Sequence, residues 1–145
     1  MTAAEFVIEV LGGPGGFKSL SAPTSTELRE RVKRGLPFSA LESLRERLQL
    51  SVTDAAALLH LPPRTLARRR AARKLDAQES DRLYRVARVA GEAIVVFGNE
   101  EKAARWLQRP NRALGGEAPI RLLDTDVGAR HVEDILGRIG HGIIG

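Results

Sequence analysis

The sequence predicts an all-α protein, with a helix-turn-helix core, a long helix after it and a small helical module at the C-terminus. Two observations support this class. From Glu27 to the end, apolar residues recur at three- and four-residue steps, and no segment there alternates apolar and polar residues as a half-buried strand does. Capping signals also mark three helix starts, because Ser39, Ser51 and Asp76 each stand three residues before an acid.

Glycine and proline interrupt the helical period at a few points and so divide the chain. Residues 1–26 contain a run of glycine and proline at 12–16 and are expected to form an N-terminal arm, a loop or a mobile segment. Residues 27–75 hold the helix-turn-helix, 76–98 the long helix and 99–145 the C-terminal module. The expected helices are Ser39–Leu48, Val52–Leu59, Pro63–Arg73, Ala77–Phe97, Glu100–Leu107, Pro119–Leu123 and Asp126–Ile139.

Composition narrows the classes of function. Of the 145 residues 43% are apolar, enough for a compact core, and 23 basic against 18 acidic residues favour an anionic partner. With no cysteine and three histidines far apart, we expect no metal site, no cofactor and no enzyme. The N-terminus lacks the basic start of a secretory signal, and no apolar run approaches the roughly 18 residues that span a membrane. We therefore expect a cytoplasmic protein without membrane contact.

The segment from Ser51 to Arg70 has the spacing of a helix-turn-helix. This motif needs a small residue where its helices cross, a short turn, and apolar anchors on the second helix. Ala56 is the small residue, His60 begins the turn, and Leu61 and Leu66 are the anchors. Position 60 is usually glycine because the backbone there tends toward positive φ, a region that histidine tolerates better than most residues.

The second helix of the motif is strongly basic, with six cations and no acid in the eleven positions from Arg64 to Lys74. On a helical wheel with Leu66 at zero, Arg64 and Arg68 fall at about 160° and 200°, and Thr65 at about 260°. These three side chains therefore face away from the core and are expected to contact base edges. The residues expected to hold phosphates are Arg69, Arg70, Arg73 and Lys74. The alternative is a solvated basic helix that contacts nothing.

The long helix carries an apolar stripe that indicates core burial, and part of it could also serve a dimer. Its members are Leu83, Val86, Ala87, Ala90, Ile94 and Phe97. Helix-turn-helix proteins commonly bind two half-sites about one DNA turn apart, so a homodimer is expected. Arg82, Arg85 and Arg88 lie on one flank at three-residue steps, and we interpret them as solvated or near phosphates.

The C-terminal module carries the pattern Trp-Leu-x-x-Pro-Asn-x-Ala-Leu-Gly-Gly over residues 106–116, too long for a chance match of the short-motif kind. Over about residues 28–145 the chain resembles the MbcA/ParS/Xre antitoxins of RES-Xre toxin-antitoxin pairs. Further features that carry this resemblance are Gly35-Leu36-Pro37, Arg64-Thr65-Leu66, Arg69-Arg70, Phe97-Gly98, Ala103-Ala104-Arg105, Pro119, Leu122-Leu123, Thr125, Gly128 and Leu136 to Gly142.

The resemblance implies three properties that periodicity cannot show. The C-terminal module would pair with a RES-domain toxin that consumes NAD or uses it for ADP-ribosylation. The extreme C-terminus would cover the active site of that toxin, and the complex would bind operator DNA and repress its own operon. The residues that the resemblance assigns to the toxin contact are Arg138, Ile139, His141, Gly142, Ile143, Ile144 and Gly145.

Two other functions remain open at this point. The chain could be an ordinary helix-turn-helix repressor without a toxin, in which case it would form no stable complex with the product of a neighbouring gene. It could also be a protein-interaction module that no longer binds DNA. Such a module would lack the steep loss of DNA affinity with salt that follows when a protein neutralises several phosphates.

Overall fold

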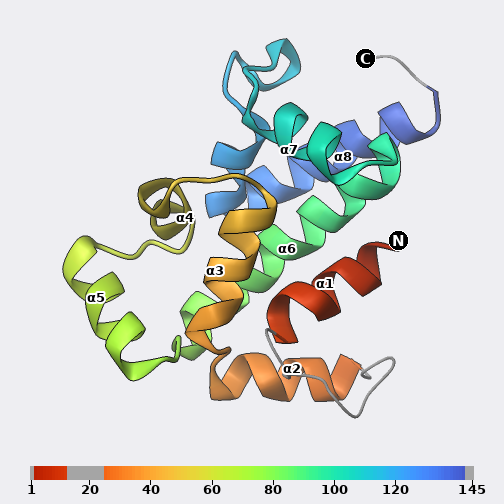
Figure 1. Cartoon of the computed structure of the whole chain (residues 1–145). Helices are drawn as coiled ribbons and strands as arrows, with labels where there is room; N and C mark the ends of the chain where they lie inside the picture. Colours follow the sequence, from red (N-terminus) through yellow and green to blue (C-terminus); the bar gives the residue numbers. More distant parts are fainter. Residues whose placement is uncertain (1, 13–24, 143–145) are drawn as a thin grey trace.

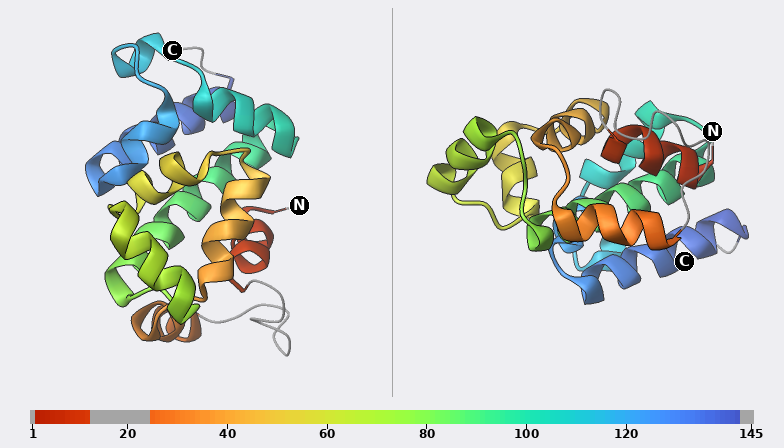
Figure 2. Two further views of the ribbon diagram at one scale, coloured as in Figure 1. Left: turned by 60° about the vertical axis from the view of Figure 1, so that its left-hand side comes forward. Right: turned by 90° about the horizontal axis from the view of Figure 1, so that it is seen from below.

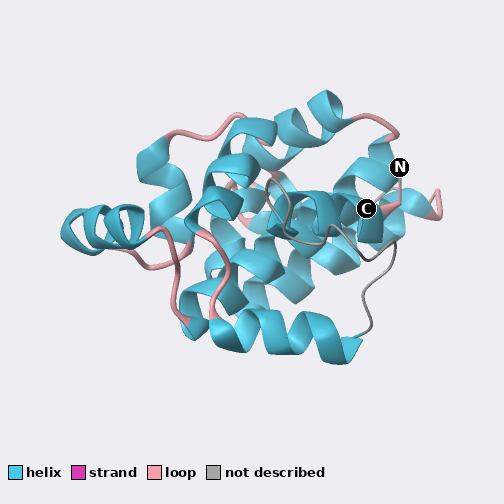
Figure 3. Cartoon of the chain, turned by 60° about the horizontal axis from the view of Figure 1, so that its bottom comes forward, coloured by secondary structure: helices cyan, strands magenta, loops and turns pink. Residues whose placement is uncertain are grey.

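The computed structural model describes residues 2–12 and 25–142, and within these ranges every secondary-structure element is a helix (Figure 1, Figure 3). The predicted all-α class is confirmed. The elements are α1 (Ala3–Gly12), α2 (Ser25–Arg34), α3 (Phe38–Arg47), α4 (Val52–Leu58), α5 (Pro63–Ala72), α6 (Ala77–Phe97), α7 (Glu100–Gln108), the 3-10 helices η1 (Arg112–Leu114) and η2 (Pro119–Asp124), and α8 (Asp126–Gly140). The helices predicted from α3 onward agree with these bounds to within one residue.

Helix α6 is the axis on which the other helices pack. Its apolar stripe is buried as predicted: Leu83, Val86, Ala87 and Ala90 are fully buried, and Phe97 at its end is partly buried against the core. Helices α1, α2, α7 and α8 all contact it, as the two views of Figure 2 show. Neither α6 nor any other helix in the described part of the chain is long and apolar enough to cross a membrane.

The expectation of an N-terminal arm is wrong for residues 3–12, which form helix α1 on the outside of α6 (Figure 1). Phe6, Val10 and Leu11 are completely buried. The two helices approach closely, since a Cβ on Gly91 of α6 would lie 2.9 Å from the carbonyl oxygen of Ala3. Residues 3–12 form a helix because burial of this short apolar face outweighs the glycines that follow it. Residues 13–24 lie outside the described residues.

Two of the three predicted caps are confirmed. The Ser51 hydroxyl accepts from the backbone N–H of Asp54 at 3.0 Å, and Asp76 forms a reciprocal capping box with Glu79. The predicted cap at Ser39 is wrong, because α3 begins one residue earlier, at Phe38, without a side-chain cap. The extended residue Pro37 sets that boundary instead, with φ of −66° and ψ of 147°.

The segment Gly35–Pro37 joins three helices at one point. The buried Leu36 N–H donates to the Ser80 hydroxyl of α6 at 2.7 Å, and the Leu36 carbonyl accepts from Leu75 N–H at 2.9 Å. Phe38 N–H donates to the Arg73 carbonyl at 3.1 Å, beside an isolated bridge between Pro37 and Lys74. The C-terminal ends of α2 and α5 therefore lie side by side at the start of α6.

Helices α4 and α5 form the predicted helix-turn-helix. Ala56 and Leu61 are buried, and Leu66 of α5 is 9% exposed, so the anchors lie where the motif requires them. His60 has a φ of +59°, which is the left-handed conformation expected at that position of the turn. In Figure 1 α5 projects from the left-hand side of the molecule, away from α6 and α8.

Candidate functional site

The outer face of α5 carries two of the three side chains predicted to reach base edges. Arg64 and Arg68 are exposed, whereas Thr65 is half-buried beside the buried Leu66. No carboxylate of the described residues forms an ion pair with either arginine. An unpaired guanidinium presents a planar fork of donors, which fits the O6 and N7 atoms of guanine or two phosphate oxygens.

Three further cations gather at the C-terminal end of α5. Arg70, Arg73 and Lys74 are exposed, and the Arg70 guanidinium lies 5.4 Å from the centre of the Phe38 ring. Arg73 ends the helix with a φ of +61°. These cations are free of ion pairs within the described chain, so they are available to an anionic partner.

Arg69 differs from its neighbours because two carboxylates of the protein bind its guanidinium. Its Nε donates to the Glu79 carboxylate at 2.7 Å and its Nη2 to Asp76 at 3.2 Å. The hydrogen bond to Glu79 raises the pKa of the Arg69 guanidinium above its ordinary value. The prediction that Arg69 holds a phosphate does not fit this geometry, because Glu79 already neutralises its charge.

A polar junction ties the helix-turn-helix to the C-terminal module. Arg82 donates to the Leu59 carbonyl at 3.3 Å, and Arg85 donates to the carbonyls of Leu123 and Asp124 at 3.2 and 3.1 Å. His60 Nε2 lies 2.9 Å from the same Asp124 carbonyl. The interpretation of Arg82 and Arg85 as solvated or near phosphates is therefore wrong, since both are half-buried and bind the backbone.

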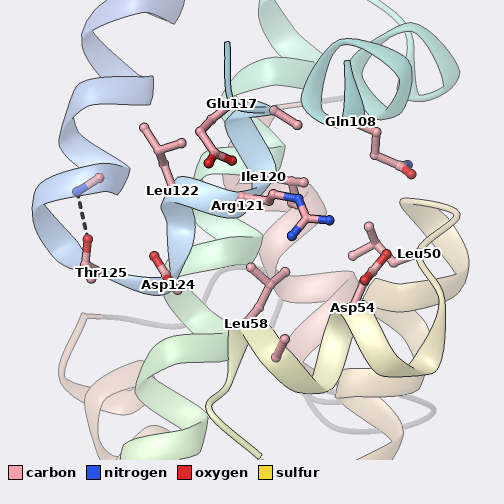
Figure 4. Close-up of a pocket in the computed structure, with 13 residues that line it drawn as sticks. Leu50, Asp54, Leu58, Gln108, Glu117, Ile120, Arg121, Leu122, Asp124 and Thr125 are labelled. Carbon is pink, nitrogen blue, oxygen red and sulfur yellow. Dashed lines mark hydrogen bonds between the residues drawn. The ribbon is translucent and has the colours of Figure 1, made fainter. Parts of the chain in front are cut away.

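A cavity of about 510 Å³ opens beside this junction, between α4 and η2 (Figure 4). Leu50, Asp54 and Leu58 line its α4 side, and Ile120 and Arg121 line the η2 side. Figure 4 shows the Arg121 guanidinium in the opening between the two sides. The cavity marks the boundary between the helix-turn-helix and the C-terminal module, which contact each other around it rather than being joined by α6 alone.

The C-terminal module packs its turns tightly around α6, α7 and α8. The Phe97 and Trp106 rings lie with centres 5.4 Å apart, and Asn111 caps η1 through a bond of its side chain to Ala113 N–H. At the corner between η2 and α8, a Cβ on Gly128 would collide with the Leu122 carbonyl. The close turn at this corner therefore requires glycine.

Helix α8 is fixed to α6 by a charged cluster. Arg88 forms an ion pair with Glu133 at 3.1 Å. The expectation that Arg88 is solvated or near phosphates is therefore wrong. The pKa of the neighbouring Glu92 is raised to about 7. Burial is the largest cause, and a hydrogen bond with Glu133 is the second. The cluster is balanced when Glu92 carries a proton, because Arg88 then faces a single negative charge.

The end of α8 is open to solvent. Arg138 is exposed and Ile139 is 36% exposed, while His141 Nδ1 lies 2.7 Å from the Gly137 carbonyl. Gly142 follows with a φ of +75°. The remaining residues of the predicted toxin contact, Ile143, Ile144 and Gly145, lie outside the described residues.

This arrangement defines a class of protein: a helix-turn-helix with an exposed basic second helix, joined to a second, helical module. Family models divide the chain in the same way. Residues 27–88 match the antitoxin Xre-like helix-turn-helix domain, and residues 92–142 match the antitoxin Xre/MbcA/ParS C-terminal toxin-binding domain. The chain belongs to the Xre/MbcA/ParS antitoxin family, and it therefore has a toxin-binding domain beside its helix-turn-helix.

Curated relatives agree with this assignment. The chain is 35% identical to Antitoxin Xre of Photorhabdus laumondii over 131 aligned residues. The alignment covers 89% of this chain and 86% of the relative. It is 32% identical to Antitoxin Xre of Yersinia enterocolitica, over 86% of this chain and 85% of the relative. A more distant relative is the Prs ADP-ribosylating antitoxin of Sphingobium, 27% identical over 89% of this chain and 87% of its own length. These relatives are named antitoxins, which are not an enzyme class.

Proposed function

We propose that this chain is the antitoxin of a type II pair that neutralises a RES-domain toxin and represses its own operon. In this proposal the C-terminal segment covers the active site of the toxin, which consumes NAD, and α5 binds the operator as part of a homodimer. The observation that supports it most is the separation of two exposed surfaces, one on α5 and the other at the end of α8.

The contact with DNA rests on the outer face of α5. Arg64, Thr65 and Arg68 read base edges in the major groove, and each good bidentate arginine contact to guanine is worth about 1–3 kcal/mol of discrimination. Arg70, Arg73 and Lys74 hold phosphates, which position the helix without reading sequence. Burial of Leu66 on the opposite side supports this orientation, because it fixes which face of α5 points outward.

The contact with the toxin rests on the end of α8 and the residues after it. Arg138, Ile139 and His141 are exposed there, and the chain continues through Gly142 to residues 143–145. One relative is named an ADP-ribosylating antitoxin, and NAD is the donor in ADP-ribosylation. That name supports an NAD-consuming toxin as the partner.

Co-expression with the neighbouring gene, which in this proposal encodes the RES-domain toxin, tests the proposal. The full chain should co-purify with the toxin and keep cellular NAD at its normal level. Deleting residues 139–145 should let NAD fall while a reporter behind the chain's own promoter stays repressed. The double variant R64A/R68A is the matched control. It should keep cellular NAD at its normal level but lose repression of the reporter.

Each other outcome contradicts one part of the proposal. Full NAD protection by the deletion variant would rule out the C-terminal segment as the cover of the active site. Absence of any complex with the full chain would favour an ordinary repressor without a toxin. Unchanged repression by R64A/R68A would favour an interaction module that does not bind DNA. Sedimentation of the protein with operator DNA at two protomers per site would support the homodimer.

A further inference from the structure

The basic surface of α5 continues onto a helix that the motif itself does not include. Helix α2 has a basic last turn, and its final residues Lys33 and Arg34 are exposed. Backbone bonds of Leu36 and Phe38 hold the segment that follows α2 against the C-terminal end of α5. The Lys74 side chain runs directly over Gly35, since a Cβ there would lie 2.9 Å from Lys74 Cε.

Five exposed cations lie in or just after the last turns of these two helices, and we call them the basic ridge: Lys33, Arg34, Arg70, Arg73 and Lys74. In the described residues no carboxylate forms an ion pair with any of them. Arg69, close to the ridge in sequence, is instead neutralised by Glu79. A concentration of unpaired guanidinium and ammonium groups on one surface is the electrostatic footprint of phosphate binding.

We propose that Lys33 and Arg34 of α2 bind phosphates of the DNA backbone that flank the base pairs read by α5. This inference rests on the proposed binding of DNA by α5. Ten residues of helix separate Arg64 from Lys74, a length of about 15 Å at 1.5 Å per residue. Since each strand advances about 3.4 Å per base pair, the ridge reaches phosphates about four base pairs from the bases under Arg64.

A purely structural role for Lys33 and Arg34 predicts something different. Cations in the last turn of a helix interact favourably with its dipole, an effect of a few tenths of a kcal/mol up to about 1 kcal/mol. In that role their removal would lower the stability of α2 and leave DNA binding unchanged. The salt dependence of DNA binding separates the two roles, because only contacts to phosphates release counterions.

The experiment measures binding of the full chain to a 30-base-pair duplex that contains its operator, taken from upstream of its own gene, by fluorescence anisotropy at several salt concentrations. The variants are K33Q/R34Q, the charge-conserving K33R/R34K, and K102Q/R105Q as a control with the same change in net charge. Lys102 and Arg105 are exposed on α7, at the far end of the molecule from α2 (Figure 1). Urea unfolding of each variant reports any change in stability.

Each lost phosphate contact should make the negative slope of log affinity against log salt shallower by about 0.9. Taken from 1 M to 0.1 M salt, this corresponds to about 8-fold weaker binding at 0.1 M. K33Q/R34Q should therefore lose about 1.8 from the slope for each bound protomer, whereas K33R/R34K and K102Q/R105Q keep the wild-type slope. A shorter duplex without flanking base pairs should abolish the difference between wild type and K33Q/R34Q. If K33Q/R34Q had the same salt slope as the wild-type chain, the role proposed for Lys33 and Arg34 would be overturned, while the proposed function would stand. If the wild-type chain did not bind the duplex at all, the proposed function would be overturned as well.

Discussion

Two adjacent arginines of α5 should respond in opposite ways to substitution by alanine. Arg68 is exposed and has no ion pair among the described residues, whereas Arg69 donates to Glu79 and Asp76. We expect Arg68→Ala to weaken DNA binding without affecting stability. Arg69→Ala should lower the free energy of unfolding and leave base discrimination nearly unchanged.

The contacts of Glu79 set the magnitude for Arg69→Ala. The Glu79 side chain is only 7% exposed, and without Arg69 its carboxylate keeps a single hydrogen bond, from the N–H of Asp76 at 2.9 Å. Loss of one partner of a buried pair costs about 3–5 kcal/mol, and loss of an exposed pair about 0–1 kcal/mol. Since the Arg69 side chain is 26% exposed, we expect a loss of about 1–3 kcal/mol. Arg68→Ala should stay within about 0.5 kcal/mol of wild type.

Urea unfolding followed by circular dichroism measures the stability of both variants. Competition between the operator and a duplex changed at single base pairs measures discrimination. Arg68→Ala should lose about 1–3 kcal/mol of discrimination at one position, which is about 5- to 150-fold. An Arg69→Ala variant as stable as wild type, or an Arg68→Ala variant with unaltered discrimination, would refute this reasoning.

Three further substitutions test other parts of the structure. Burial is the main cause that raises the pKa of Glu92 from 4.5 to about 7 in the folded state. Between these two pH values the folded state keeps a proton that the unfolded state has released, so wild-type stability should fall as the pH rises from 5 to 8. Glu92→Gln should remove about 1–2 kcal/mol of that fall in urea unfolding, after allowance for partial exposure, and an equal fall in the variant would contradict it. Ser80→Ala leaves the buried Leu36 N–H without its acceptor and should cost about 1–3 kcal/mol of unfolding free energy; no loss would argue against that bond. In Gly128→Ala the added Cβ would collide with the Leu122 carbonyl in the turn before α8. This variant should capture less toxin in a pull-down and still bind the operator, whereas normal capture would show that this corner can relax.

The parts of this structure that depend on neighbouring residues in the sequence were predictable. The helix bounds from α3 onward, the Asp76 capping box and the left-handed turn at His60 all follow from local patterns, and the structure confirms them. The inward direction of Leu66 followed from its place as an apolar anchor of the motif, and burial of its side chain confirms it. Local rules therefore predicted the frame of the helix-turn-helix and the outward direction of Arg64 and Arg68.

Contacts between distant segments were not predictable. A helical wheel gives Arg68 and Arg69 different directions, but it cannot show that Arg69 is paired, because tertiary folding brings Glu79 to Arg69. The same limit explains Arg85, which reads as a solvated cation but donates to carbonyls 38 and 39 residues away in the sequence. The apolar face of residues 3–12 had a partner, α6, that no local pattern could reveal.

Chemical-shift mapping by NMR tests the central claim most directly, which is that α5 binds DNA on a surface separate from the toxin contact at the end of α8. The ¹⁵N-labelled protein is titrated with a duplex from upstream of its own gene. The largest shifts should fall on the amides of residues 63–74 and at the C-terminal end of α2, with residues 126–142 unchanged. Largest shifts within α8, with α5 unaffected, would contradict the account.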